Sequence, residues 1–555
     1  MRMGQSTTPN FKLLTRLLSN DRKDMGRVVV FATLHGAISL SFPLGIQALI
    51  GQIMGGRLSA SWWLLVAGVL FAIVLAGVLY LMQLRIVELL QQRIFVRSSF
   101  EFAHRIPLLR SDVLRRDYLP DLINRFFDTL TVQKELPKLI VDGATAILQI
   151  FFGLLLLLLY DTWFVLVAIA IIALVVLAIR VSLYRGLSTS YEESTHKHEV
   201  AQQLEEMARI GPALKAEGET GRAHARVDEA VNRYLDARTR HFRILYGQHI
   251  WMVIVRFAFT ALLLIAGGAL VVERTVSIGE FVAVEIVFFI IMNNAEKIFR
   301  LLEGLYDVHA GVEKIASVVQ LPLEKQPDGG SPGANMPSWE LEWSPWALNV
   351  PAGKKVGLVL GEGTQVQPFF EALAMPLSDA GEGMKINGLS VQLWDQKAYA
   401  KRMEDNLPYY GFISGSVMDN LMRRGAKREE VVAALLRLGL QPEHFGEAGW
   451  QTQIHPDFFR WHPELAMQLH SARALAGDAS LRIMYDALAG LRPKEREQWL
   501  DEMVRAGQSG TLVCITHRKD ALQRMDLVVV VQNDECVYKG PWSEMPNELK
   551  ENEIC

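Results

Sequence analysis

Several polar residues lie inside otherwise apolar stretches of the first 300 residues, and three can carry charge: His35, Arg256 and Glu285. An ionisable group near a bilayer centre costs about 2.5–3.5 kcal/mol on insertion scales, so such groups usually face protein or water. One interpretation is a polar cavity within the membrane, with three amides nearby: Gln47, Asn293 and Asn294. The alternative is that Arg256 extends to the inner interface and His35 bonds a neighbouring helix.

Glu285 is the most informative of these residues, because nothing one helical turn away can pair with its carboxylate. The neighbours at that spacing are Phe281, Val282, Phe288 and Phe289. The nearest cations, Arg274 and Lys297, would lie roughly 16–18 Å away along a helix. A partner for Glu285 must therefore come from another helix or from a ligand.

These polar residues fall in three of six apolar runs, each long enough to cross the roughly 30 Å hydrocarbon core of a bilayer. Half of the 555 residues are hydrophobic, and the excess is concentrated in this part of the chain. The runs are Val28–Ile50, Trp62–Leu84, Leu139–Tyr160, Trp163–Leu183, Ile250–Val272 and Ser277–Phe299. The sequence therefore predicts an α-helical membrane domain with six transmembrane helices over residues 28–321.

Positive charge is distributed unevenly between the connections. The N-terminal segment 1–27 and the long connections 85–138 and 184–249 are rich in arginine. The other connections are short turns near Arg57, Asp161 and Arg274. Since positive charge marks the cytoplasmic side, we predict a multi-pass protein with both termini in the cytoplasm. No cleavable signal peptide is expected.

The two long connections are expected to be helical. Residues 85–104 and 185–243 place apolar and charged positions at helical spacing, which indicates membrane helices that continue into the cytoplasm. Each hairpin has a break near its middle, at residues 105–120 and 210–212. A short transverse helix is predicted at each tip.

A turn-rich linker, residues 322–337, leads into a soluble domain, residues 338–555. Its landmarks follow in a fixed order: V-P-A-G-K-K-V-G-L-V (350–359), F-I-S-G-S-V-M-D-N-L (412–421), S-A-R-A-L-A-G-D (471–478) and V-C-I-T-H-R (513–518). With the six spans and long hairpins, they resemble one half of an ABC exporter of the type I secretion and multidrug kind. The resemblance implies an α/β P-loop-like nucleotide-binding domain and a bacterial inner-membrane location. It also implies coupling helices at about 109–121 and 208–218.

The phosphate loop of that domain is degenerate. In a working P-loop, G-x-x-x-x-G-K-[ST], backbone N–H groups and a lysine bind phosphates and a hydroxyl holds Mg²⁺. Only Gly361 and Gly363 remain of the loop. Val366 stands at the lysine position, and Gln367 and Pro368 stand at the hydroxyl positions.

The remaining landmarks show the same loss. Tyr485 occupies the Mg²⁺-binding aspartate position and Asp486 the catalytic glutamate position, whereas His517 of the H-loop is intact. The other altered positions are Pro408 or Tyr409 (Q-loop), Trp461–Glu464 (signature) and Arg492 (D-loop). The surviving residues are interpreted as catalytic remnants or as purely structural residues. We expect no ATPase activity, with ATP and Mg²⁺ bound weakly at most or supplied by a partner subunit.

The resemblance implies a second half-transporter as partner, in a homodimer or heterodimer, within membrane lipid. It leaves room for a periplasmic adaptor, and no nucleic acid is expected. No metal site is predicted, since the spacing of Cys514, Cys536 and Cys555 matches no common zinc pattern. The leading hypothesis is a hydrolysis-deficient subunit of an export system. The alternative is a non-transporting scaffold or regulator built on the same fold.

Overall fold

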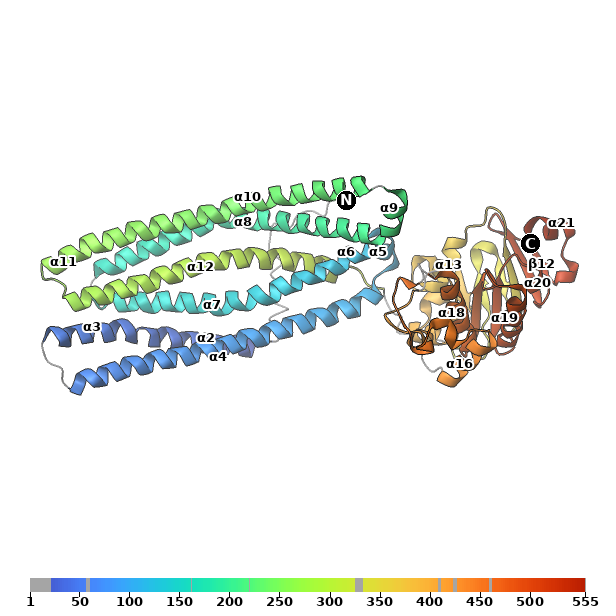
Figure 1. The fold of residues 1–555 in the computed structure, drawn as a ribbon, viewed down its shortest axis with the longest axis horizontal. Helices are drawn as coiled ribbons and strands as arrows, with labels where there is room; N and C mark the ends of the chain where they lie inside the picture. The colour runs from blue at the N-terminus through green and yellow to red at the C-terminus, as the bar shows by residue number, and fades with distance from the viewer. Residues whose placement is uncertain are drawn as a thin grey trace. The chain divides into compact units, whose positions relative to one another are not determined.

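The computed structural model describes residues 21–55, 60–160, 162–218, 220–324, 333–407, 411–422, 427–458 and 462–554. The chain divides into two compact units, residues 1–109 with 113–322 and residues 323–555 with 110–112. Figure 1 shows long helices side by side in the first unit and a sheet covered by helices in the second. The predicted combination of a helical membrane domain and an α/β domain is confirmed.

Six helical stretches of the described chain are long and apolar enough to cross a membrane, as predicted. The helices before Pro322 are α2 (Arg22–Ser39), α3 (Ser41–Met54), α4 (Ala60–Arg105), α5 (Ser111–Arg116), α6 (Leu119–Asn124), α7 (Asp128–Leu157), α8 (Thr162–Arg209), α9 (Gly211–Glu217), α10 (Thr220–Leu262), α11 (Gly268–Val272) and α12 (Ile278–Val319). Their main apolar core joins α7, α8, α10 and α12 around residues such as Phe164, Ile171 and Ile291.

Two spans are less regular than the sequence pattern indicates. The first breaks at Leu40 into α2 and α3, three residues before Pro43. Proline lacks a backbone N–H and its ring crowds the preceding turn, which accounts for the break. The fifth span contains a π-helical segment, Leu263–Gly267, between α10 and α11. An apolar pattern does not distinguish such breaks from a continuous helix.

The long hairpins are helical, as predicted. Helix α4 has 46 residues and α8 has 48. At about 1.5 Å per residue, each is roughly 70 Å long, more than twice the hydrocarbon thickness. Short helices stand at the predicted breaks: α5 and α6 in the first hairpin and α9 in the second. Gly218, with a left-handed φ of +68°, ends α9.

The second unit is built on a six-stranded sheet, in the order β12-β11-β3-β10-β9-β6. The strands are β3 (Lys355–Leu360), β6 (Met403–Asp405), β9 (Leu481–Tyr485), β10 (Thr511–Ile515), β11 (Leu527–Gln532) and β12 (Glu535–Gly540). All neighbours pair in parallel except β11 and β12. The carboxyl ends of the parallel strands therefore meet at one edge, where ligand sites form in such sheets.

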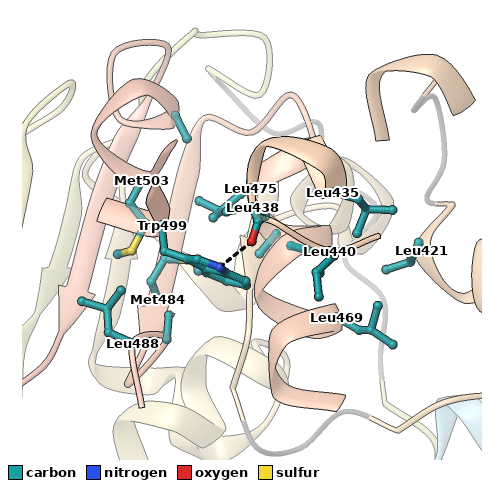
Figure 2. Packing of buried hydrophobic residues seen from close by; sticks show 14 of the residues in the cluster. Leu421, Leu435, Leu438, Leu440, Leu469, Leu475, Met484, Leu488, Trp499 and Met503 are labelled. Carbon is teal, nitrogen blue, oxygen red and sulfur yellow. Dashed lines mark hydrogen bonds between the residues drawn. The ribbon is translucent and has the colours of Figure 1, made fainter. Parts of the chain in front are cut away.

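The remaining strands form a four-stranded and a two-stranded sheet. The strands are β1 (Leu341–Trp343), β2 (Leu348–Val350), β4 (Met384–Ile386), β5 (Leu389–Ser390), β7 (Gly415–Ser416) and β8 (Gln453–Ile454). The helices are α13 (Val366–Ala374), α14 (Gln396–Arg402), α15 (Val417–Leu421), α16 (Arg428–Arg437), α18 (Pro463–Ala476), α19 (Pro493–Ala506), α20 (Lys519–Leu522) and α21 (Asn547–Glu553). Figure 2 shows Trp499 inside an apolar cluster, where its indole Nε1 donates to the Leu438 carbonyl (3.0 Å).

Candidate functional site

The degenerate phosphate loop connects β3 to α13 and is fixed to its neighbouring strand. The Gly361 N–H donates to the Val531 carbonyl at 2.8 Å, and the Thr364 hydroxyl donates to the same oxygen at 3.0 Å. Gly363 has φ +75°, a conformation that residues with a Cβ rarely adopt. The strand–loop–helix arrangement is therefore present, and the two predicted glycines lie in it.

The turn of the β11–β12 hairpin packs against this loop. Its residues, Asn533 and Asp534, have left-handed φ values of 50° and 64°. The Asp534 carboxylate accepts the Gln365 N–H at 2.8 Å and the indole N–H of buried Trp346 at 3.0 Å. A carboxylate of the protein thus accepts a backbone N–H at the start of α13, where a phosphate loop would present such groups to its ligand.

The C-terminal helix α21 connects the loop to His517. The ring Nδ1 of His517 lies 2.8 Å from the Glu553 carbonyl. Because a carbonyl only accepts, Nδ1 must carry the proton. The Glu553 carboxylate accepts from the Gln532 amide at 2.7 Å, and a Cβ at Gly361 would stand only 2.8 Å from it. His517 therefore contacts Glu553, and a side chain at Gly361 would collide with the same residue.

The substituted positions make structural contacts. Val366 begins α13 and packs against the apolar core, and Gln367 bonds Glu371 one turn later at 3.2 Å. Pro368 follows in the first turn of the same helix. Among these three, there is no cation for phosphate and no hydroxyl for Mg²⁺.

Tyr485 ends β9, where the Walker B aspartate is expected. Its ring packs edge-to-face on Phe370, with centroids 4.9 Å apart. The Asn406 side chain holds its backbone, accepting from the Tyr485 N–H (2.6 Å) and donating to its carbonyl (2.9 Å). An aromatic ring therefore lies at the metal position.

Asp486 follows with a left-handed φ of 42°. Burial raises the pKa of its carboxyl, and the nearby His517 and Arg518 oppose that shift. One isolated carboxylate does not replace the lysine, hydroxyl and aspartate. Taken together, the residues of this site do not fit a Mg²⁺-bound triphosphate.

The structure describes some of the other altered positions of the signature, D-loop and Q-loop. His462 and Pro463 begin α18, and Arg492 precedes α19 with its N–H bonded to Glu495 (3.0 Å). Pro408, Tyr409 and Trp461 lie outside the described residues, as do Arg57, Asp161 and Cys555.

In the membrane unit, Arg256 of α10 and Glu285 of α12 line one pocket together with mainly apolar residues, including Phe259, Phe288 and Phe289. Arg256 forms an ion pair with Glu296 at 3.3 Å. Within the described part of the chain, Glu285 has no hydrogen-bond or ion-pair partner.

The other expected cavity residues lie elsewhere. His35 Nδ1 is 3.3 Å from the Gln149 amide, and Gln47 accepts from the Tyr160 hydroxyl at 2.5 Å. The Asn294 amide donates to the Ile290 carbonyl of its own helix at 2.8 Å, and Asn293 is exposed. None of these four residues lines the pocket of Arg256 and Glu285. The His35 contact agrees with the alternative of a bond to a neighbouring helix.

Residues 25–295 match the model of the ABC transporter transmembrane region. The fold is similar to that of a bacterial Atm1-family ABC exporter solved with ATP bound, with a TM-score of 0.78, 15% identity and 96% of each chain covered. The chain therefore has the fold of an ABC exporter, with a membrane unit that matches the ABC transporter transmembrane region.

A curated relative is the glutathione/L-cysteine transport system ATP-binding/permease protein CydD of Haemophilus influenzae (strain ATCC 51907 / DSM 11121 / KW20 / Rd). The two are 26% identical over 209 residues, which is 37% of this exporter-type chain. The match spans about a third of the relative's own length, 35%.

The structure also shows a cavity that the sequence did not indicate. It has a volume of about 600 Å³ and lies between α4 and α7. Its lining includes Gln83, Arg85, Glu88, Lys138 and Asp142. Arg85 belongs to the arginine-rich connection 85–138, and no spacing along the chain relates α4 to α7.

A second missed residue is Arg482 in β9, which is only 2% exposed. Its guanidinium donates to the carbonyls of Gly477, Ala479 (3.2 Å) and Ala506 (2.9 Å), beside the ends of α18 and α19. Burial lowers the pKa of Arg482, against the opposing effect of Glu404 and Asp478. The sequence signal for Arg482 is a charged residue within an otherwise apolar strand.

Proposed function

We propose that this chain is a subunit of an export system and does not hydrolyse ATP itself. One observation supports the proposal most directly. The Asp534 carboxylate accepts the Gln365 N–H at the phosphate loop, and Val366 stands at the position of the phosphate-binding lysine. A hydrogen bond to a charged group contributes about 1.5–3 kcal/mol, and losing one transition-state donor lowers the rate about 10²–10³-fold. Here several such groups are replaced together.

ATP turnover tests this proposal directly. The purified full chain should show no Mg²⁺-dependent ATPase activity above background. The Asp486→Ala and His517→Ala variants should match it, since neither residue has its catalytic partners. Turnover that either substitution abolishes would refute the proposal, whereas weak nucleotide binding without turnover is compatible with it.

We further propose that the chain works as a dimer, with itself or with an ATPase-competent half-transporter. Exporters of this type generally act as dimers of half-transporters. In such dimers each ATP site combines the phosphate-loop and metal-binding residues of one subunit with the signature residues of the other. This chain lacks both sets of residues. Even beside an intact partner, neither ATP site would therefore have its full set of catalytic residues. Affinity purification in mild detergent should recover an intact ATPase subunit if hydrolysis drives this system. Recovery with other proteins and no ATPase would favour the scaffold or regulator.

Both termini are proposed to be cytoplasmic, in a bacterial inner membrane, because arginine is concentrated in the long hairpins. A membrane-impermeant thiol reagent applied from outside should label a cysteine placed at Ser59 and not one at Arg222. The reverse pattern would overturn this topology.

We propose a substrate class on the basis of the curated relative's name. Small thiol compounds with amino and carboxylate groups, such as glutathione and L-cysteine, are the first candidates for transport. Glu285 is proposed to line the translocation route, since its carboxylate faces a pocket without a described partner. Glu285→Gln should impair transport at normal expression, and an unchanged transport rate would remove Glu285 from the route.

A further inference from the structure

The cavity between α4 and α7 lies where the second and third predicted spans reach the arginine-rich side. Its volume of about 600 Å³ falls in the range of small-molecule sites. Two of its charged groups are already neutralised: Lys138 pairs with Glu135 at 3.2 Å, and Asp142 pairs with Lys297 at 2.8 Å.

Two other charged groups of the cavity are not neutralised. Arg85 has no hydrogen-bond or ion-pair partner among the residues that the structure describes. Glu88, one turn later on α4, accepts only the neutral Gln92 amide at 2.8 Å. The cavity therefore presents one free cation and one free anion, and these do not pair with each other within the described chain.

The buried amide of Gln83 is a third polar group of the cavity that is available to a ligand. Gln83 is 3% exposed, and its Oε1 accepts weakly from Thr145 at 3.4 Å. Its Nε2, also buried, finds no acceptor in the described part of the structure. An unpaired buried donor is unfavourable, so an acceptor supplied by a ligand would be stabilising.

We propose that this cavity binds a small zwitterion with a carboxylate and a primary ammonium group, such as an amino acid or short peptide. The planar guanidinium of Arg85 suits a carboxylate, which the Gln83 amide would also contact. The Glu88 carboxylate would take the ammonium group. The inference rests on the proposed transport function and places its substrate.

Equilibrium binding to the full chain tests the site without ATP or transport. The chain is placed in nanodiscs of phosphatidylcholine and phosphatidylglycerol and titrated with radiolabelled glutathione or L-cysteine. Arg85→Gln should weaken the binding of glutathione and of L-cysteine at least about tenfold, as expected for a lost charge-assisted hydrogen bond. Arg180→Gln is the matched control, since Arg180 is an exposed arginine of α8 outside this cavity. It should bind like the wild type.

The ammonium group is tested separately. Glu88→Gln should weaken the binding of L-cysteine. It should leave the binding of N-acetyl-L-cysteine unchanged, because that compound has no ammonium group to pair with Glu88. All variants should keep the wild-type melting temperature, which separates lost binding from lost folding.

Equal binding by Arg85→Gln and Arg180→Gln would overturn the site. A lipid headgroup with the same two groups is the competing source of this chemistry. If phosphatidylethanolamine nanodiscs abolish glutathione binding, the cavity is a lipid site and the proposal fails. A chain that hydrolysed ATP would contradict the proposed function and leave this binding result unaffected.

Discussion

The phosphate loop and the cavity between α4 and α7 present their hydrogen-bond donors in opposite states. At the loop, Asp534 accepts from both the Gln365 N–H and the Trp346 indole. In the cavity, the Gln83 amide and the Arg85 guanidinium have no acceptor among the described residues. The first set of donors stabilises the fold, and the second is available to a ligand.

This difference separates a site that has become structural from one that can still bind. An unpaired buried donor costs about 1–3 kcal/mol, so donors satisfied within the chain contribute to folding and cannot be removed freely. We therefore expect substitutions among the satisfied donors of the soluble unit to lower stability. Substitutions in the cavity should change binding instead.

The largest effect is expected for Arg482, the most deeply buried cation of the soluble unit described above. Arg482→Met leaves carbonyls beside the ends of α18 and α19 without their donor. The free energy of unfolding should fall by about 3–5 kcal/mol. Thermal melting of the full chain in detergent, followed by tryptophan fluorescence, measures this loss. Arg505→Met, at a side chain 61% exposed, should melt like the wild type. Equal melting temperatures for the two variants would show that the hydrogen bonds of Arg482 do not stabilise the fold.

The next effect concerns the carboxylate on the loop. Asp534→Gly keeps the left-handed backbone but leaves the buried Trp346 indole N–H unpaired and releases the exposed Gln365 N–H to water, at a cost of about 2–3 kcal/mol. Asp534→Asn retains an acceptor oxygen and tolerates the same φ, so it should recover most of the melting temperature. If the glycine variant melts like the wild type, the carboxylate does not stabilise the loop.

A smaller effect separates packing from backbone strain at the loop. Gly363 and Gly388 have nearly equal φ values, +75° and +76°. A Cβ at Gly363 would clash with the Asn533 side chain, whereas one at Gly388 meets nothing within 4 Å. Gly363→Ala should therefore cost about 1–2 kcal/mol more than Gly388→Ala in the same melting assay. Equal losses would mean that the hairpin turn does not pack on the loop.

The smallest effect on stability is expected in the cavity. Gln83→Leu removes a buried amide whose Nε2 has no described partner. The melting temperature should stay constant or rise, by the equivalent of at most about 1 kcal/mol, while glutathione binding weakens. A large drop in melting temperature would show that Gln83 is satisfied in the folded chain and would remove the contrast with the loop.

The sequence by itself determined the broad architecture and the missing chemistry. Runs of apolar residues must cross a bilayer as helices, so the six spans followed from length and composition. The α/β P-loop-like domain followed from the ordered landmarks of the chain and their resemblance to ABC exporters. The substitutions at Val366 and Tyr485 were likewise visible without coordinates, because residue identity alone removes a cation or a metal ligand.

Only the tertiary structure decided which distant groups meet. Asp534 is 169 residues beyond its partner Gln365, and Arg482 bonds carbonyls at the ends of two separate helices. The breaks at Leu40 and in Leu263–Gly267, and the cavity between α4 and α7, also lay outside any local pattern. Helical and strand periodicities report which face of an element is apolar. They carry no information about which element packs there, because that depends on the side-chain packing and chain path of the whole fold.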